Sequence, residues 1–123
     1  MIVQNDYLYF SHLGVLTMFL LVYLYEKKAW VFGRTIYHNL TQMAKFADCY
    51  LPLWQPELIN AKKAKHLIPV LEHSLSFLKD QKDKCEKFNP EDGWGSYENL
   101  LDFVTYYLQA CKDHPNAKIS VSH

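Results

Sequence analysis

The order of apolar and polar positions divides this chain into two unlike parts. The 19 residues from Tyr7 to Tyr25 carry no formal charge, and 15 of them are apolar. From Thr35 onward, apolar residues instead recur at helical spacing among charged ones, as they do in a domain that faces water. This pattern predicts a hydrophobic N-terminal segment over residues 1–34 and a small soluble domain over residues 35–123.

The segment Tyr7–Tyr25 has the length of a membrane helix, because about 19 residues at ~1.5 Å each roughly match a ~30 Å hydrocarbon core. Asp6 precedes it, whereas Lys27, Lys28 and Arg34 follow it, so the positive-inside rule places the following domain in the cytoplasm. We therefore expect a membrane protein whose domain faces the cytoplasm. Two alternatives stay open: a buried or partner-docked helix of a soluble cytoplasmic protein, and an N-terminal extension outside the natural fold.

The soluble part reads as helices between two short strands. Asn39 and Ser96 are suited to cap the starts of helices. Because a single strand is not stable in water, the two strands are expected to pair with each other. The fold class expected is α+β and mostly helical: a three-helix bundle closed by a two-stranded sheet from the two ends of the domain, preceded by the hydrophobic helix. The expected elements are a strand over Trp30–His38, helices from Asn39 to Leu51, from about Asn60 to Lys87 and from Ser96 to His114, and a strand over Lys118–Ser122.

Charge and cysteine usage exclude several classes of protein. The chain has 13 Lys and Arg against 13 Asp and Glu, whereas a nucleic-acid binder needs a basic surface, so we expect no nucleic acid partner. Aromatic residues make up 15% of the chain, which excludes a disordered protein. Cys49, Cys85 and Cys111 form neither a disulfide framework nor a CxxC zinc pattern, so we expect reduced thiols.

The loop from Asn89 to Glu98 is the best candidate binding site. It places a Trp between two glycines and beside three carboxylates, an arrangement that can stack on a sugar or a base, or hold a cation. The alternative is a structural turn whose Trp fills the core. His38 and Asn39 end the first predicted strand and could meet this loop. The candidate ligand-binding residues are Glu91, Asp92, Trp94, Tyr97, Glu98, His38 and Asn39.

No metal, cofactor or catalytic residue is indicated. His66 and His73 are about two helical turns apart, ~10.5 Å, which is too far for one metal ion without a third ligand. Cys111 and His114 supply two ligands, which make no site. No GxSxG, P-loop, HExxH or dinucleotide-binding fingerprint occurs. An enzyme is therefore unsupported, though not excluded.

The segment NPEDGWGSYE, taken with YHNLTQMA and CKDHPNAKISVS, resembles a family of small uncharacterised proteins from phage and bacterial genomes. The resemblance covers about residues 35–122, with N-P-x-x-G-W-G-x-Y-E as its most specific part, and leaves out the hydrophobic N-terminus. It implies a shared fold and a phage-like, mobile-element origin. It carries over no catalytic residue.

These observations predict a small non-enzymatic interaction or accessory protein with a protein partner, anchored in a membrane through Tyr7–Tyr25 with its domain on the cytoplasmic side. The alternative is a soluble phage-type accessory protein that binds a host protein or a small ligand through the loop around Trp94.

Overall fold

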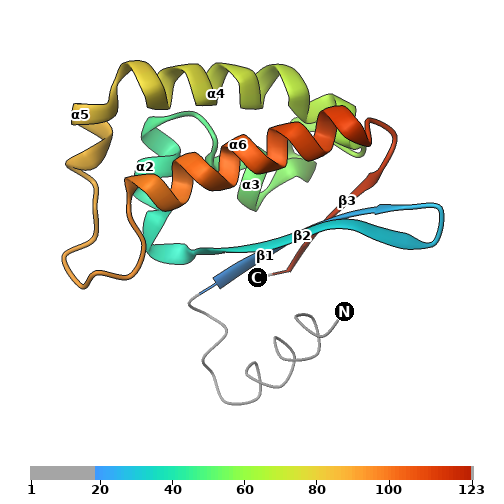
Figure 1. The fold of residues 1–123 in the computed structure, drawn as a ribbon, viewed down its shortest axis with the longest axis horizontal. Coiled ribbons are helices and arrows are strands. Elements are labelled where there is room, and N and C mark those ends of the chain that lie inside the picture. The colour runs from blue at the N-terminus through green and yellow to red at the C-terminus, as the bar shows by residue number, and fades with distance from the viewer. Residues whose placement is uncertain (1–18, 123) are drawn as a thin grey trace, which may run out of the picture.

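The computed structural model describes residues 19–122, which form a three-stranded antiparallel sheet with helices over one of its faces (Figure 1). The 3-10 helices are written η. In chain order, the elements are β1 (Phe19–Glu26), β2 (Ala29–Tyr37), η2 (His38–Leu40), α2 (Thr41–Phe46), α3 (Tyr50–Trp54), η3 (Pro56–Ile59), η4 (Ala64–Leu67), α4 (Ile68–Asp80), α5 (Lys82–Glu86), α6 (Tyr97–Asp113) and β3 (Lys118–Ser122).

The prediction of an apolar N-terminal helix is wrong over the residues that can be compared. Phe19–Tyr25, the second part of the expected membrane helix, lies in β1, whereas residues 7–18 fall outside the described range. Leu20, Val22 and Leu24 belong to the core cluster shared with the helices, and Leu21 and Tyr23 form a separate buried cluster. A strand that is buried on both faces reads as a continuous apolar run, which resembles a membrane helix in sequence.

The predicted two-stranded sheet is also wrong. The strand order is β2-β1-β3, so the two strands that were expected to pair with each other each pair with β1 instead. The boundary expected between residues 34 and 35 falls within β2. Within residues 19–122, no helix is both long enough and apolar enough to cross a bilayer.

The hairpin turn between β1 and β2 explains why the first strand was missed. Lys27 and Lys28 have positive φ angles of 51° and 65°, as both central residues of a type I′ turn do. Asn-Gly or Asp-Gly is the usual sequence signal for this turn, and two lysines give none. The two basic residues that suggested a cytoplasmic membrane flank therefore turn the chain back within one sheet.

The helices are more broken than their apolar stripes suggest. The helix expected from Asn39 to Leu51 is divided into η2, α2 and α3, and Asp48 between α2 and α3 has a positive φ of 61°. Pro69 lies in the first turn of α4, where its missing N–H costs no helical hydrogen bond. Two expectations are confirmed: the side chain of Ser96 accepts a hydrogen bond from the Asn99 N–H at the start of α6, and Lys118–Ser122 is a strand.

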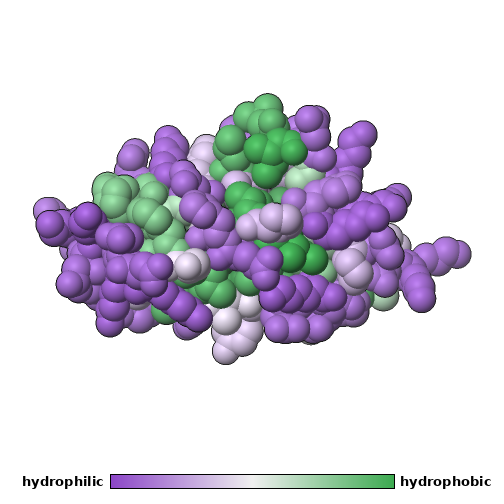
Figure 2. Space-filling model, turned by 90° about the horizontal axis from the view of Figure 1, so that it is seen from above, coloured by the Kyte–Doolittle hydropathy of each residue, from purple (hydrophilic) through white to green (hydrophobic). Residues whose placement is uncertain are grey.

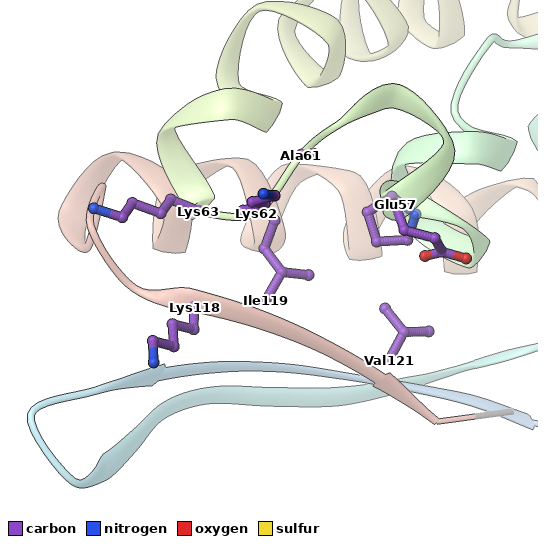
Figure 3. Close-up of a pocket in the computed structure, with 8 residues that line it drawn as sticks. Glu57, Ala61, Lys62, Lys63, Lys118, Ile119 and Val121 are labelled. Atoms are coloured by element: carbon purple, nitrogen blue, oxygen red, sulfur yellow. The ribbon is translucent and has the colours of Figure 1, made fainter.

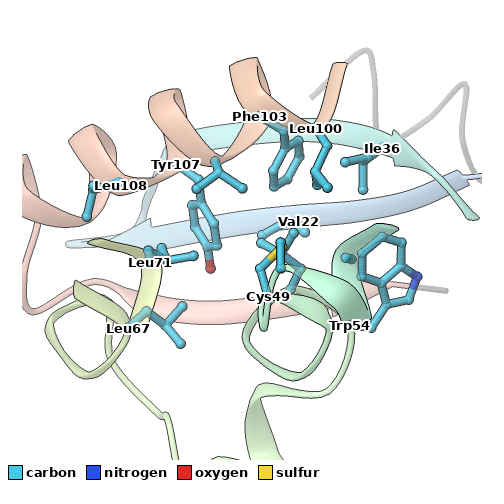
Figure 4. Close-up of a cluster of buried hydrophobic side chains, with 14 of the residues drawn as sticks. Val22, Ile36, Cys49, Trp54, Leu67, Leu71, Leu100, Phe103, Tyr107 and Leu108 are labelled. Carbon is cyan, nitrogen blue, oxygen red and sulfur yellow. The ribbon is translucent and has the colours of Figure 1, made fainter. Parts of the chain in front are cut away.

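The main core lies between the sheet and the helices (Figure 4). Tyr97 and Tyr107, both on α6, are among its largest buried side chains. The Tyr97 hydroxyl donates a hydrogen bond to the Leu78 carbonyl oxygen at 2.7 Å. The buried Tyr107 hydroxyl, in contrast, has no hydrogen-bond partner among the described residues. Figure 4 labels Val22, Ile36, Cys49, Trp54, Leu67, Leu71, Leu100, Phe103, Tyr107 and Leu108 from this core.

Removing the hydroxyl from each tyrosine should therefore have opposite effects. Tyr97→Phe should lower the free energy of unfolding by about 1 kcal/mol, because it deletes a buried hydrogen bond. Tyr107→Phe should leave that free energy unchanged or raise it by up to about 1 kcal/mol, because it removes an unpaired buried polar group. Urea unfolding of both variants measures the difference, and a larger loss in Tyr107→Phe would contradict this account of the core.

Candidate functional site

The segment from Asn89 to Ser96, here called the Trp94 loop, joins α5 to α6. Gly93 and Gly95 have positive φ angles of 77° and 92°, a region that side chains with a Cβ rarely adopt. The expected turn is thus present in the region where the sequence placed it. Its glycines bring Trp94 back toward the end of β2.

Hydrogen bonds fix the backbone of the Trp94 loop. The Trp94 N–H donates to Asp92 Oδ1 at 2.9 Å, and Asn39 Nδ2 donates to Asp92 Oδ1 at 3.2 Å and Oδ2 at 3.3 Å. At the other end of the loop, the Tyr97 N–H donates to Asn89 Oδ1 at 2.7 Å. The Asp92 carboxylate therefore ties the loop both to its own backbone and to η2.

Trp94 lies on the surface. It is 47% exposed, and its ring meets the Tyr37 ring edge to face with the centroids 5.8 Å apart. A Cβ added to the next residue, Gly95, would lie 3.1 Å from atoms of Leu40 and Tyr37, so the loop backbone packs tightly beneath the indole. Trp94 is therefore supported on one side and open to a partner on the other.

The structure brings three of the seven predicted site residues together and leaves four apart. Asn39, Asp92 and Trp94 meet as described above. Tyr97 is only 2% exposed and lies in the core, and His38 Nδ1 accepts a hydrogen bond from Trp54 Nε1 at 2.9 Å. Glu91 and Glu98 are exposed and make no ion pair in the described chain.

The histidines within residues 19–122 do not converge on a metal site. Nδ1 of His66 accepts hydrogen bonds from backbone N–H groups, His73 Nε2 lies 3.2 Å from Asp48 Oδ2, and His114 Nδ1 lies 3.6 Å from Glu26 Oε2. No group of three or more His, Cys, Asp or Glu side chains within residues 19–122 is arranged to hold a metal ion. Each of these described histidines thus has a local structural contact.

The three thiols are buried and free. Burial raises the pKa of Cys111 from its ordinary value of 9.0 to about 12. Burial is also the main cause of the raised pKa of Cys85 and of the still higher pKa of Cys49. Because the thiolate is the nucleophilic form, these cysteines are poor candidates for covalent chemistry.

A cleft of about 610 Å³ lies between β3 and the segment from η3 to η4 (Figure 3). The sequence alone gives no signal for this cleft, because its walls come from two segments that are far apart in the chain. The alternation of Ile119 and Val121 on β3 was visible in the sequence, but the opposite wall was not. The lining residues are Pro56, Glu57, Ala61, Lys62, Lys63, Lys118, Ile119 and Val121.

A second, more apolar hollow of about 290 Å³ lies beside α3 and α4. Leu51 and Ile59 line it and are each 38% exposed, and the neighbouring Leu58 is 63% exposed. Figure 2 shows, from above the helices, that hydrophobic groups interrupt an otherwise mainly hydrophilic surface. The remaining lining residues are Lys45, Asp48, Tyr50, Pro52 and Val70.

The packing beneath Trp94 can be tested with the two loop glycines. Gly93→Ala should lower the free energy of unfolding by about 1 kcal/mol, because it places a Cβ at positive φ in open space. Gly95→Ala should cost about 2 kcal/mol or more, because its Cβ must also displace Leu40 or Tyr37. Chemical denaturation measures both values, and equal losses would show that the close packing has no energetic weight.

The raised thiol pKa values predict a loss of stability in alkaline solution. Above a pH of about 9, the unfolded chain releases the Cys111 proton, whereas the folded chain keeps it until the pH approaches about 12. The folded state then binds more protons, so the free energy of unfolding falls as the pH rises through this range. Cys111→Ala should show a flatter fall in pH-dependent denaturation, and parallel curves for the two proteins would contradict the burial of this thiol.

Comparison with known proteins found no relative of this chain. The chain matched no protein-family model, no curated protein and no solved structure. The resemblance of residues 35–122 to phage and bacterial proteins therefore stays a prediction.

Proposed function

We propose that this chain is a small non-enzymatic interaction module that binds a protein partner through the Trp94 loop. The observation that carries the proposal is a half-exposed Trp on a loop whose backbone is already fixed by the Asp92 carboxylate. Trp is enriched among the residues that contribute most to binding energy at protein interfaces. A partner that covers the indole would gain this burial without having to order the loop.

The fixed conformation of the Trp94 loop favours binding, because ordering a flexible loop on binding costs conformational entropy. Immobilising a side chain or a loop at an interface costs about 0.5–1.5 kcal/mol per side chain, and this cost is smaller where the bound conformation exists beforehand. Here Tyr37 supports the ring, and Asn39 and Asp92 hold the backbone. The exposed carboxylates of Glu91 and Glu98 would supply a polar rim around the apolar centre.

A protein partner is favoured over a small ligand by the shape of the site. Small-molecule sites are usually concave and enclose most of their ligand. Trp94 lines neither of the two clefts described above. The buried thiols and the locally engaged histidines support a binding role rather than a catalytic one. The resemblance to phage and bacterial proteins favours a host protein as the partner.

Replacement of Trp94 tests this proposal. The chain and its Trp94→Ala variant serve as baits in lysates of the cells that encode it, and a partner held only by the unchanged chain is then titrated directly by calorimetry. Trp94→Ala should raise the dissociation constant by about thirtyfold or more, because the loss of an interface Trp costs ~2 kcal/mol of binding free energy. The melting temperature should change by only a few degrees, because Trp94 lies outside the buried core.

Tyr106→Ala is the matched control, because Tyr106 is another exposed aromatic, 55% accessible, on α6. It should leave the affinity within about twofold. Asp92→Ala keeps the indole but removes the acceptor that orders the loop, so it should give an intermediate loss. A partner that binds all three variants equally would show that the Trp94 loop is not the interaction surface.

A further inference from the structure

Within residues 19–122, the outer edge of β3 is paired over only part of its length. β3 is an edge strand of the described sheet, and the one bridge found there on its outer side joins Lys118 to Lys63. The hydrogen bonds of this bridge run from the Ala64 N–H to the Ala117 oxygen at 2.9 Å and from the Ile119 N–H to the Lys62 oxygen at 3.4 Å. Lys62 and Lys63, just before η4, thus begin to extend the sheet on this side.

His66 stops that extension. The next hydrogen bond of an antiparallel ladder would run from the Lys62 N–H to the Ile119 oxygen. The Lys62 N–H donates instead to His66 Nδ1 at 3.2 Å, and the Lys63 N–H donates to the same atom at 3.2 Å. The Ile119 carbonyl is therefore left without a ladder partner in the described chain.

Val121 extends the open part of this edge. Backbone groups two residues apart on a strand point the same way, so the N–H and carbonyl of Val121 face the same side as those of Ile119. No strand within residues 19–122 pairs with this side of Val121. An unpaired strand edge is a template for another extended chain.

The cleft beside this edge combines an apolar floor with a basic rim. The side chains of Ile119 and Val121 point from β3 into the space below the η3–η4 segment (Figure 3). Lys62, Lys63 and Lys118 gather toward one end of the cleft, whereas Glu57 lies toward the other. Three ammonium groups against one carboxylate make the local charge positive, although the whole chain is neutral.

We propose that the cleft binds an acidic peptide segment in extended conformation, which adds to the edge of β3. Its backbone pairs with the N–H and carbonyl of Val121 and donates to the Ile119 carbonyl, because the Ile119 N–H is already bonded to Lys62. Its apolar side chains cover the floor, and carboxylates at the end nearest Lys62 face the three lysines. Alternate side chains of a strand point to opposite sides, so a segment in which acidic and apolar residues alternate meets both surfaces at once. This site lies on the opposite edge of the sheet from β2 and is independent of the Trp94 loop.

The test uses a fluorescein-labelled peptide in which Glu and Val alternate, titrated with the full chain and followed by fluorescence anisotropy. Saturable binding is expected, and it should weaken as salt is added, because the attraction between exposed charges is screened. Reversing two rim charges with Lys62→Glu and Lys118→Glu should weaken binding by at least about tenfold. Lys79→Glu, an exposed lysine on α4, is the matched control and should leave the affinity within about twofold.

Strand addition is separated from simple charge attraction by two further probes. Val121→Pro removes one edge N–H at a position where an edge strand tolerates proline, and a Glu–Val peptide methylated on alternate backbone nitrogens removes the matching donors. Both should weaken binding by about tenfold while the circular dichroism spectrum of the protein stays unchanged. Equal binding of the methylated peptide, or of a Lys–Val peptide, would overturn the proposal. So would self-association of the chain that blocks the peptide, because the edge would then belong to a second copy.

Discussion

The burial of β1 on both of its faces is the constraint on which the rest of this structure depends. Leu20, Val22 and Leu24 join the core beneath the helices, while Leu21 and Tyr23, 0% and 6% exposed, are buried in a cluster of their own. Both edges of β1 are also paired, because β2 and β3 bond to it from opposite sides. The buried stretch of such a strand, Leu20–Leu24, can carry no charge. The uncharged, apolar composition of this stretch follows from that requirement.

Both proposed binding surfaces depend on the same strand. The Trp94 loop rests on Tyr37, which pairs with Phe19 at the beginning of β1. The cleft lies against β3, whose position is set by its pairing with residues 21–25 of β1. The two surfaces therefore occupy different edges of one rigid sheet. A partner at one of them need not compete with a partner at the other.

Sequence reasoning succeeded where local chemistry decides the structure. Short stretches of sequence were enough to predict four features: the cap at Ser96, the apolar stripe of α6, the glycine turn before it and the alternation in Lys118–Ser122. Asn39 was expected to lie near this loop, and its side chain does contact Asp92 there. These features need no knowledge of distant contacts.

The failures share a different cause. An apolar run has the same appearance whether a bilayer or a sheet surrounds it, and the lysines of the hairpin turn resemble a membrane flank. His38 was expected near the Trp94 loop, but its Nδ1 accepts a hydrogen bond from Trp54. Tyr97 was expected in the binding site, but its side chain lies in the core and donates to the Leu78 carbonyl. The cleft beside β3 depends on a contact between Lys63 and Lys118 that no local pattern encodes. Tertiary packing decided each of these cases.

The strand order also determines when the fold can be completed during synthesis. β1 can form its hairpin with β2 as soon as both have left the ribosome, since the two are adjacent in the chain. Its other edge must wait for β3, which follows every helix of the described domain. Until then, the most apolar strand of this domain has an open side, and such edges promote aggregation. The nascent chain therefore passes through a period in which a chaperone, or early docking of α6 against the hairpin, would have its greatest effect.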